Sequence, residues 1–353
     1  MLPRKMAQVA GVLTDLTKSV ANLQGINKML SRLVGIAVKG ASWYKAVYKS
    51  NQIKEILRKA RRAAQNPIPV QERPYSSTTP SLTITSDASE YMWGGVITKN
   101  NTDILKTQQL WSKEQSNWHI TRQEAQASAN MVQIALNYKY IKNNSNLTIK
   151  TDSKAAVSTW NKGSAKTKLN DIILPVAVQL ARKAVNKTAE HIPRNQNLQA
   201  DFLSRSIKDK YNYKLNQSVF RTICKQLQIQ PTIDLFAADN NHQLPRYYTM
   251  RPSPTSTGTD AFKHNWSKEI AYANPPWPLI PKMLDKIIKD QATVLTVLPL
   301  WTCKPWWPRV LRLRASKIIK FKGELFSDKF GKFMPPPRWL LAATVLSGRS
   351  PMT

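Results

Sequence analysis

Four acidic residues stand at positions from which their carboxylates can meet around a metal ion. Asp87 and Asp152 each follow a run of strand-forming residues, and Glu124 and Asp201 each fall in the first turn of a segment with helical apolar spacing. If the two strands are neighbours, the two aspartates lie side by side at one edge of the sheet, and the helix starts can point to the same edge. We therefore expect the four side chains to converge.

Carboxylates that converge repel one another, which raises their pKa values unless a cation neutralises them. Hard divalent cations take oxygen ligands, and two of them roughly 4 Å apart can activate a water molecule and stabilise the leaving oxygen of a phosphodiester. The sequence thus predicts that Asp87, Glu124, Asp152 and Asp201 are catalytic residues that bind two Mg²⁺ ions, with Mn²⁺ as the alternative.

Each of these residues also has an ordinary structural interpretation. A single aspartate after a strand most often caps a turn or a helix. Glu124 stands three residues after Thr121 and could complete a capping box at the start of its helix. The metal site is favoured because four such positions occur in an order that one sheet can bring together.

The segments around these residues alternate between strand and helix patterns. Their order, βββαβααβα, predicts an α/β fold with a five-stranded mixed sheet and helices packed against it. The expected elements are strands at 82–86, 92–98 and 104–111, a helix from 121, a strand at 147–151, helices at 155–160 and 168–185, a strand at 188–192 and a helix at 198–206.

Six short motifs in this segment resemble those of the ribonuclease H domain of retroelement reverse transcriptases, and most of all those of DIRS-type retrotransposons. They are Ser86-Asp87-Ala88-Ser89, Trp93-Gly94-Gly95, His119-Ile120-Thr121-Arg122-Gln123-Glu124, Thr151-Asp152-Ser153, His191-Ile192-Pro193 and Asn197-Leu198-Gln199-Ala200-Asp201-Phe202-Leu203-Ser204-Arg205. The resemblance implies cleavage of the RNA strand of an RNA–DNA hybrid.

Two positions depart from that family pattern. The Pro-Gly pair that is usual before the last motif is Pro193-Arg194 here. Some relatives carry a catalytic histidine near the last aspartate, whereas His191 lies inside the last expected strand and is interpreted as a structural residue. Loss of the catalytic histidine would slow turnover without removing the metal site.

A second candidate site lies in the C-terminal part of the chain. A strand and turn are expected at Thr232–Ala237, and another strand ends in Asn274-Pro275-Pro276-Trp277. This Asn-Pro-Pro-aromatic turn resembles that of phage-type DNA adenine methyltransferases, which also follow the ribonuclease H domain in DIRS-type elements. The resemblance assigns Asn274 and Trp277 to a base pocket, and Asp234 and Phe236 to a pocket for S-adenosylmethionine. The expected cofactor-binding residues are therefore Asp234, Phe236, Asn274, Pro275, Pro276 and Trp277.

Other interpretations of this second site stay open. The sequence shows no Gly-rich loop for the cofactor, and a Pro-Pro pair can serve only as a rigid turn. Trp301, Trp306 and Trp307 could stack on bases, although buried core positions are the commoner outcome for tryptophan.

The chain is expected to consist of several parts. We expect a helical remnant of a reverse transcriptase connection at 1–65, a Pro-rich linker at 66–80, the ribonuclease H-like domain at 81–207, a basic helical connector at 208–230 and a second α/β domain, methyltransferase-like, at 231–353. Prolines within 66–80 resist regular structure, which sets the first boundary.

The net charge of +32 indicates a polyanionic partner, because each Lys or Arg that contacts a phosphate releases counterions. We expect an RNA–DNA hybrid, DNA or RNA; an anionic membrane and a ribosomal assembly are the alternatives.

The apolar runs are much shorter than a bilayer-spanning helix, so no membrane segment is expected. With only two distant cysteines, Cys224 and Cys303, a reducing intracellular compartment, cytoplasmic or nuclear, fits best.

Two functions from different classes fit these observations. The first is a two-metal endonuclease acting on hybrids within a retrotransposon polyprotein; a DNA adenine methyltransferase activity of the C-terminal domain is an alternative to it. The second is a catalytically decayed remnant that binds nucleic acid without cutting it. Intact carboxylates at all four positions favour the nuclease.

Overall fold

The structure is a computed structural model, and it describes residues 3–20, 23–40, 43, 51–69, 81–164, 166–205, 213–327 and 333–349. Two compact units are distinguished, one made of Met1–Gln108 with Trp118–Arg205, the other of Gln109–Asn117 with Ser206–Thr353. Most of the linker expected at 66–80, and the start of the connector expected at 208–230, lie outside the described residues.

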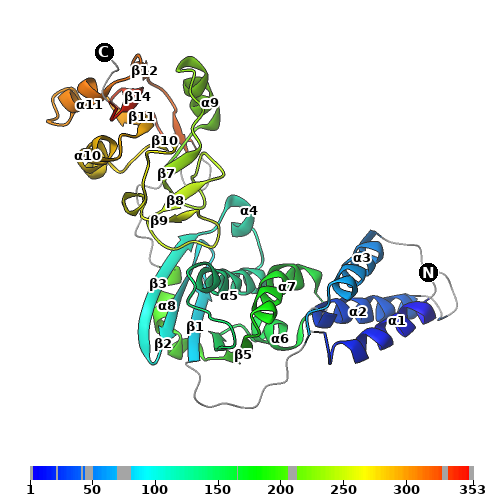
Figure 1. The fold of residues 1–353 in the computed structure, drawn as a ribbon. Coiled ribbons are helices and arrows are strands. Elements are labelled where there is room, and N and C mark those ends of the chain that lie inside the picture. The colour runs from blue at the N-terminus through cyan, green and yellow to red at the C-terminus, as the bar shows by residue number, and fades with distance from the viewer. Residues whose placement is uncertain are drawn as a thin grey trace. The chain divides into compact units, whose positions relative to one another are not determined.

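The first unit is built on a five-stranded mixed sheet in the order β3-β2-β1-β4-β5 (Figure 1). β1 pairs with β2 in antiparallel and with β4 in parallel, and β4 pairs with β5 in parallel. This arrangement confirms the predicted fold class. The strands are β1 (Ser81–Ala88), β2 (Met92–Lys99), β3 (Thr102–Leu110), β4 (Asn146–Thr151) and β5 (Asn186–His191).

Four helices follow the strands of this sheet in the predicted order. Their apolar faces are buried; in α5, for example, Ala125, Val132 and Ala135 are fully covered. The helices are α5 (Ile120–Asn137), α6 (Lys154–Lys162), α7 (Thr167–Arg182) and α8 (Leu198–Arg205). Pro175 lies inside α7.

Two consecutive glycines in β2 let helices approach the sheet on both sides. A Cβ atom on Gly95 would lie 2.6 Å from Met131 of α5, whereas one on Gly94 would lie 2.5 Å from Leu203 of α8. Because successive residues of a strand point to opposite faces, α5 and α8 pack on opposite faces of the sheet. Any larger residue at either position would push a helix away.

Three helices precede the sheet within the same unit, as the apolar spacing predicts: α1 (Pro3–Leu16), α2 (Gln24–Gly40) and α3 (Asn51–Gln65). They share a core of their own, to which Leu174 of α7 also contributes. Asn170 donates a hydrogen bond to the carbonyl oxygen of Gly25 at 3.1 Å, and Lys59 pairs with Asp171 at 2.8 Å. These contacts join the helices to α7.

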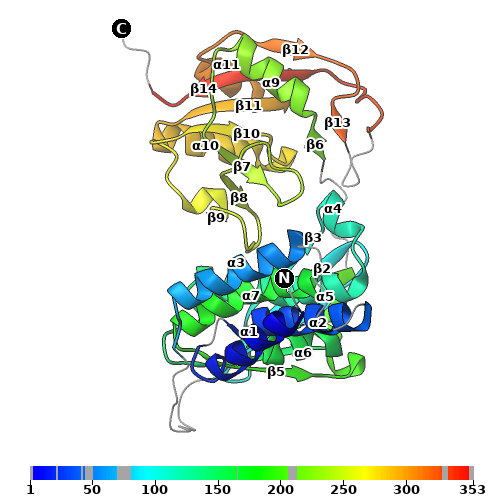
Figure 2. The same cartoon turned by 90° about the vertical axis from the view of Figure 1, so that its right-hand side faces the viewer.

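The second unit contains a seven-stranded sheet in the order β12-β14-β11-β10-β7-β8-β9, seen strand above strand in Figure 2. The neighbouring strands β11, β10, β7, β8 and β9 are all parallel to one another, whereas β14 runs antiparallel to both β11 and β12. Its strands are β7 (Ile233–Ala237), β8 (Tyr247–Thr249), β9 (Gly258–Thr259), β10 (Ile270–Ala273), β11 (Thr293–Pro299), β12 (Ile319–Phe321) and β14 (Leu341–Ser347).

Helices cover both faces of this second sheet. On one face, Ala271 and Val294 pack with α10 (Ile280–Asp290) and α11 (Trp307–Leu313). On the other face, their neighbours Tyr272 and Leu295 pack with residues of α9, Gln217–Gln226. A sheet buried on both faces explains the nearly continuous apolar composition of its central strands. The segment expected as a connector thus supplies a helix to this core.

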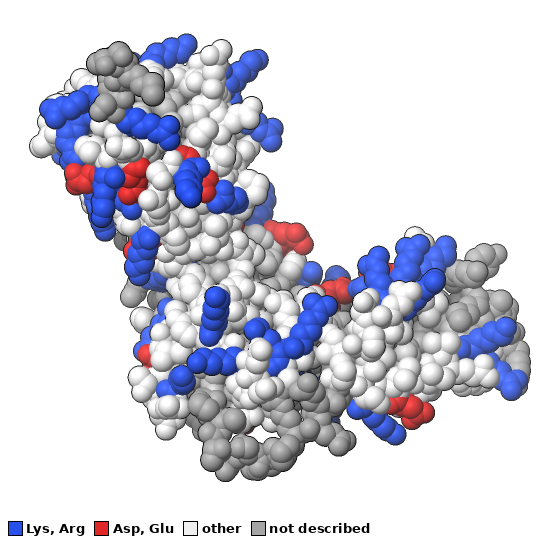
Figure 3. All heavy atoms as spheres, in the orientation of Figure 1, with Lys and Arg blue, Asp and Glu red and all other residues white. Residues whose placement is uncertain are grey.

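The remaining elements of the second unit are small. They are the helix α4 (Lys113–Ser116), the 3-10 helices η3 (Ala261–Lys263) and η4 (Trp277–Leu279), and a two-stranded ladder of β6 (Lys214–Leu215) and β13 (Phe326–Ser327). On the face shown in Figure 3, Lys and Arg side chains occur on both units and far outnumber Asp and Glu. Among the described residues, no helix combines the length and apolar character needed to cross a membrane.

Candidate metal centre

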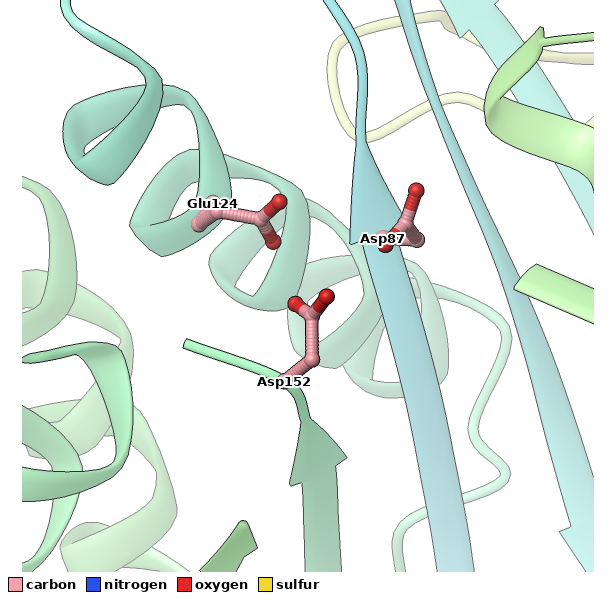
Figure 4. A group of neighbouring side chains, drawn as sticks. All are labelled: Asp87, Glu124 and Asp152. Atoms are coloured by element: carbon pink, nitrogen blue, oxygen red, sulfur yellow. The ribbon is translucent and has the colours of Figure 1, made fainter. Parts of the chain in front are cut away.

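Three of the four predicted carboxylates meet in the first unit. Ligand atoms of Asp87, Glu124 and Asp152 all lie within 4.8 Å of one another. Figure 4 shows the side chains reaching from β1, from α5 and from the end of β4 into one shared space. Asp87 and Glu124 are buried, with 2% and 7% of their surface exposed. The group is therefore a compact acidic cluster at one end of the sheet.

The pairing of β1 with β4 places the two aspartates side by side. Thr85 lies opposite Lys150 in the parallel register, and each aspartate follows its strand residue by two positions. The aspartates therefore occupy equivalent places on neighbouring strands, with both side chains at the same edge. This is the neighbour relation on which the sequence argument depended.

Glu124 reaches the cluster from the second turn of α5. The helix begins at Ile120 and is capped by His119, whose Nδ1 accepts a hydrogen bond from the backbone N–H of Thr121 at 3.2 Å. The capping box proposed for Thr121 and Glu124 is therefore wrong. The Oε1 atom of Glu124 instead accepts from the backbone N–H of Ala88 at 3.3 Å. That bond turns the carboxylate toward β1.

Burial makes ionisation of the cluster unfavourable. Burial raises the pKa of Glu124 to about 9, and the charges of Asp87 and Asp152 add to this effect. Burial likewise raises the pKa of Asp87 to about 6, although a hydrogen bond from Ser204 works in the opposite direction. Without a cation, the folded protein therefore holds Glu124 protonated at neutral pH.

The donor set fits a hard divalent cation. Three carboxylates offer oxygen ligands only, which is the chemistry that Mg²⁺ and Mn²⁺ prefer. The Oε2 atom of Glu124 is buried and has no hydrogen-bond partner among the described residues. A buried carboxylate oxygen without a partner is costly, and a bound cation would remove that cost.

Asp201, the fourth predicted ligand, is held by two arginines instead. Its Oδ1 accepts from Nε of Arg205 at 2.9 Å and from Nε of Arg194 at 3.1 Å. Burial works to raise the pKa of Asp201, but these hydrogen bonds outweigh it and the pKa lies below its ordinary value. Asp201 is close enough to raise the pKa of Asp87 by its charge, yet it is not part of the triad.

Two residues that the sequence argument did not assign hold Asp87 in place. Ser204 of α8 donates its hydroxyl to Oδ2 of Asp87. The buried Asn197 donates to Oδ1 of Asp87 at 3.4 Å and to the carbonyl oxygen of Ser86 at 3.1 Å. Both lie in the last motif quoted above, Asn197 just before α8 and Ser204 within it. The signal that could have found them is their polar character at buried positions.

Gly94 lies opposite Asp87 in the β1–β2 pairing, so the close approach of α8 depends on it. A Cβ there would lie 2.7 Å from the backbone N of Ser204, which cannot rotate away. We expect Gly94→Ala to lower the free energy of unfolding by about 2 kcal/mol, as overpacking does, and to weaken the Ser204–Asp87 contact. Urea unfolding measures the first effect and Mg²⁺ titration the second.

A matched control for Gly94 exists in α1. A Cβ on Gly11 meets nothing within 4 Å, so Gly11→Ala should leave stability unchanged or raise it by up to about 1 kcal/mol through helix propensity. Equal urea midpoints for Gly94→Ala and the unmodified chain would show that α8 can shift without cost.

In the second unit, the predicted residues lie at the point where the strand order reverses. From β7 the chain continues through β8 and β9 on one side, then returns to β10 and β11 on the other. Ligands of such sheets bind beyond the carboxyl ends of the strands at this switch point. Phe236 near the end of β7 and Asn274, Pro275 and Pro276 after β10 lie there.

Asp234 and Trp277 differ in what they contact. Both carboxylate oxygens of the buried Asp234 accept backbone N–H groups, from Phe236 at 3.3 Å and from Gln243 at 3.0 Å, so this side chain orders the loop after β7. Burial raises the pKa of Asp234 to about 6. Trp277 is 43% exposed and contacts Trp301.

Residues 86–207 match the protein family described as reverse transcriptase-like. Over these residues the chain is similar to reverse transcriptase-like domains. The match includes all four predicted carboxylates, and the triad of this domain lies where β1, β4 and α5 meet. No curated protein matches the chain.

Solved structures similar to the chain include three ribonucleases H. The N-terminal ribonuclease H domain of rv2228c from Mycobacterium tuberculosis has 18% identity and a TM-score of 0.30, covering 35% of this chain and 91% of that one. Ribonuclease H1 from Halobacterium salinarum has 12% identity and a TM-score of 0.29, covering 35% and 92%. LC11 ribonuclease H1 in complex with an RNA/DNA hybrid has 14% identity and a TM-score of 0.29, covering 35% and 92%.

Arg194 competes with any cation for Asp201 of the reverse transcriptase-like domain. Its side chain is 61% exposed, and an exposed ion pair contributes up to about 1 kcal/mol. If Asp201 is a metal ligand, Arg194→Ala should lower the Mg²⁺ concentration for half-maximal binding roughly threefold to fivefold. The titration is done at constant ionic strength, with Lys59→Ala as a control that breaks another exposed pair. An unchanged Mg²⁺ affinity would exclude Asp201 as a ligand.

Proposed function

We propose that the reverse transcriptase-like domain is a divalent-metal-dependent endonuclease that cleaves the RNA strand of RNA–DNA hybrids. The observation that carries this proposal is the buried triad of Asp87, Glu124 and Asp152, with ligand atoms within 4.8 Å of one another. Such an arrangement is unfavourable by itself and becomes favourable with a cation. Asp201 completes the set of four catalytic carboxylates once it is released from its arginines.

The residues of this chain have distinct roles in the proposed reaction. Asp87, Glu124, Asp152 and Asp201 would hold two Mg²⁺ ions, which would supply activation of a water molecule and stabilisation of the leaving oxygen. Ser204 and Asn197 fix the Asp87 carboxylate. The excess of Lys and Arg, +32 over the chain, favours binding of phosphates without sequence preference.

The substrate class follows from the family and from nucleic-acid chemistry. A hybrid offers 2′-hydroxyl groups on one strand only, in a wide and shallow minor groove where protein donors and acceptors can find them. The motifs of this domain resemble those of retroelement polyproteins. We place the chain in a DIRS-type polyprotein, acting on replication intermediates in the cytoplasm or nucleus.

The test is cleavage of a hybrid whose RNA strand is labelled, with Mg²⁺ or with EDTA. We expect RNA fragments with Mg²⁺ and none with EDTA, and no cleavage of double-stranded DNA. Double-stranded RNA serves as a second control, because it has the same 2′-hydroxyls on both strands. Binding of the hybrid without cleavage would instead support the decayed binding module.

A methyltransferase-like function is a second candidate, for the second unit. The observation that favours it is the Asn274–Trp277 turn at the switch point of a doubly wound sheet, beside the loop that Asp234 orders. We expect S-adenosylmethionine to bind there, which isothermal titration calorimetry measures directly. Tritium transfer from labelled cofactor to DNA then tests activity. An absence of binding heat at millimolar cofactor would remove this candidate.

A further inference from the structure

Three tryptophans form a cluster at one edge of the sheet in the second unit. The ring centroids of Trp277 and Trp301 are 4.8 Å apart, those of Trp277 and Trp339 are 5.3 Å apart, and those of Trp301 and Trp339 are 5.6 Å apart. All three pairs meet edge to face, with interplanar angles of 73°, 83° and 61°. Such pairs are mutually stabilising, so the cluster has a defined shape.

The sheet itself brings these rings together. Trp277 follows β10 and Trp301 follows β11, whereas Trp339 precedes β14, which runs in the opposite direction. All three therefore lie at the same edge, just beyond the ends of three neighbouring strands. The backbone N–H of Leu300 donates to the carbonyl oxygen of Leu340 at 2.8 Å, which ties the segments carrying Trp301 and Trp339 to each other.

The cluster differs from the core tryptophans of the same unit. Trp266, Trp306 and Trp307 are 0%, 9% and 5% exposed, so two of the three residues considered for base stacking from the sequence are core residues. Trp277 is 43% exposed, and Trp301 and Trp339 are half-buried. Large aromatic rings that gather at the surface mark a binding surface more often than isolated exposed residues do.

Cationic side chains flank the cluster. The described residues within 301–327 and 333–340 include eight Lys and Arg but only one acidic residue. Nζ of Lys304 lies 5.8 Å from the ring centroid of Trp301, and the exposed Arg338 directly precedes Trp339. Aromatic rings combined with positive charge suit a polyanion that also offers flat apolar faces.

We propose that Trp277, Trp301 and Trp339 form a stacking platform for unpaired bases of single-stranded nucleic acid, with Lys304 and Arg338 contacting its phosphates. Bases of a single strand can stack on aromatic side chains, whereas bases of a duplex are already covered by their neighbours. The platform is a binding site of the second unit that requires neither the nuclease nor methyl transfer. Its ligand is nevertheless the product class of the reaction proposed for the first unit, because removal of RNA from a hybrid leaves a single DNA strand.

The experiment measures binding of two fluorescein-labelled 12-nucleotide strands by fluorescence anisotropy, with the full chain carrying Asp152→Asn in EDTA. One strand is oligo(dT) and the other is an abasic strand with the same phosphates. Trp301→Ala and Trp339→Ala should each weaken oligo(dT) binding about tenfold and leave abasic binding unchanged. Trp301→Phe keeps an aromatic ring and should bind oligo(dT) within about threefold of the parent.

Trp43→Ala is the matched control, because Trp43 is 44% exposed and lies in the first unit. It should leave binding of both strands unchanged. Selective loss of oligo(dT) binding in the two alanine variants supports the platform. Equal loss against both strands, no loss against either, or double-stranded DNA competing as well as oligo(dT) would each overturn it.

Discussion

Replacing Asp152 by asparagine is expected to lower the rate of RNA–DNA hybrid cleavage at least about 10³-fold. The amide keeps the shape of the side chain but removes the negative charge that Asp152 contributes to the triad. Metal ions supply several kcal/mol of transition-state stabilisation, and about 4 kcal/mol corresponds to 10³ in rate. Asp152 is partly exposed at the end of β4, so the fold should tolerate the change.

The measurement compares initial cleavage rates at saturating Mg²⁺ for Asp152→Asn and for Asp171→Asn. Asp171 lies in the same unit, and its replacement removes the same charge together with an exposed ion pair to Lys59. This control should cleave within about twofold of the unmodified chain. Hybrid affinity, measured in EDTA, should be the same for all three proteins. Cleavage that survives Asp152→Asn would place the nuclease activity outside the triad or in a contaminant.

The sequence was sufficient to predict the sheet and three of its carboxylates, because local signals and topology agreed. Runs of strand-forming residues located β1 and β4, and a parallel pair at neighbouring positions then forces Asp87 and Asp152 to one edge. Glu124 was identified correctly as a cluster member, but its supposed capping role was not. A motif can identify a site residue correctly and still give the wrong helix cap; here the N-cap of α5 is His119.

Side-chain partners were harder to predict, because they depend on distances between elements. The pair Asp201–Arg205 has the four-residue spacing of a helical ion pair and could have been read from the sequence. The contact of Arg194 with Asp201 spans the turn between β5 and α8 and could not have been predicted from the sequence. The role of Asp201 as a metal ligand therefore remains a prediction, which the Arg194→Ala titration tests.

The second unit shows the same division between topology and contacts. Alternation of strands and helices predicted an α/β domain, and the Asn-Pro-Pro-Trp turn lies at a place where such sheets bind ligands. The grouping of Trp301 and Trp339 with Trp277 could not be predicted, because it arises from an antiparallel strand inserted beside β11. Contacts between residues far apart in the sequence cannot be predicted from local patterns. They become apparent only when the strand order is known.

Replacing Glu124 by glutamine is expected to stabilise the metal-free protein while abolishing cleavage. Glu124 has a pKa of about 9 in the folded protein and ionises near 4.5 in the unfolded chain. Unfolding therefore releases a proton between these values, and stability falls as the pH rises through this range. A neutral amide avoids this cost, so the free energy of unfolding at pH 7 should rise by roughly 3 kcal/mol.

The pH dependence separates this effect from a simple gain in packing. Without metal, the unmodified chain should be most stable below about pH 4.5 with respect to Glu124 and should lose stability up to about pH 9. The glutamine variant should show a shallower decline that ends earlier, because Asp87, with a pKa of about 6, still contributes. Urea unfolding in EDTA at several pH values measures both slopes. Glu190→Gln changes an exposed strand residue and should leave the slope as it is.

Addition of Mg²⁺ should reverse the order of stability. A ligand that binds only the folded state stabilises it in proportion to the logarithm of its concentration over Kd, and the unmodified chain has the intact triad. Saturating Mg²⁺ should therefore raise its melting temperature by several degrees, whereas Glu124→Gln should gain little. The unfavourable ionisation of Glu124 and the affinity for metal have one cause, namely the burial of its carboxylate beside the charges of Asp87 and Asp152. A glutamine variant that is less stable than the unmodified chain in EDTA, or that gains equally from Mg²⁺, would refute this connection.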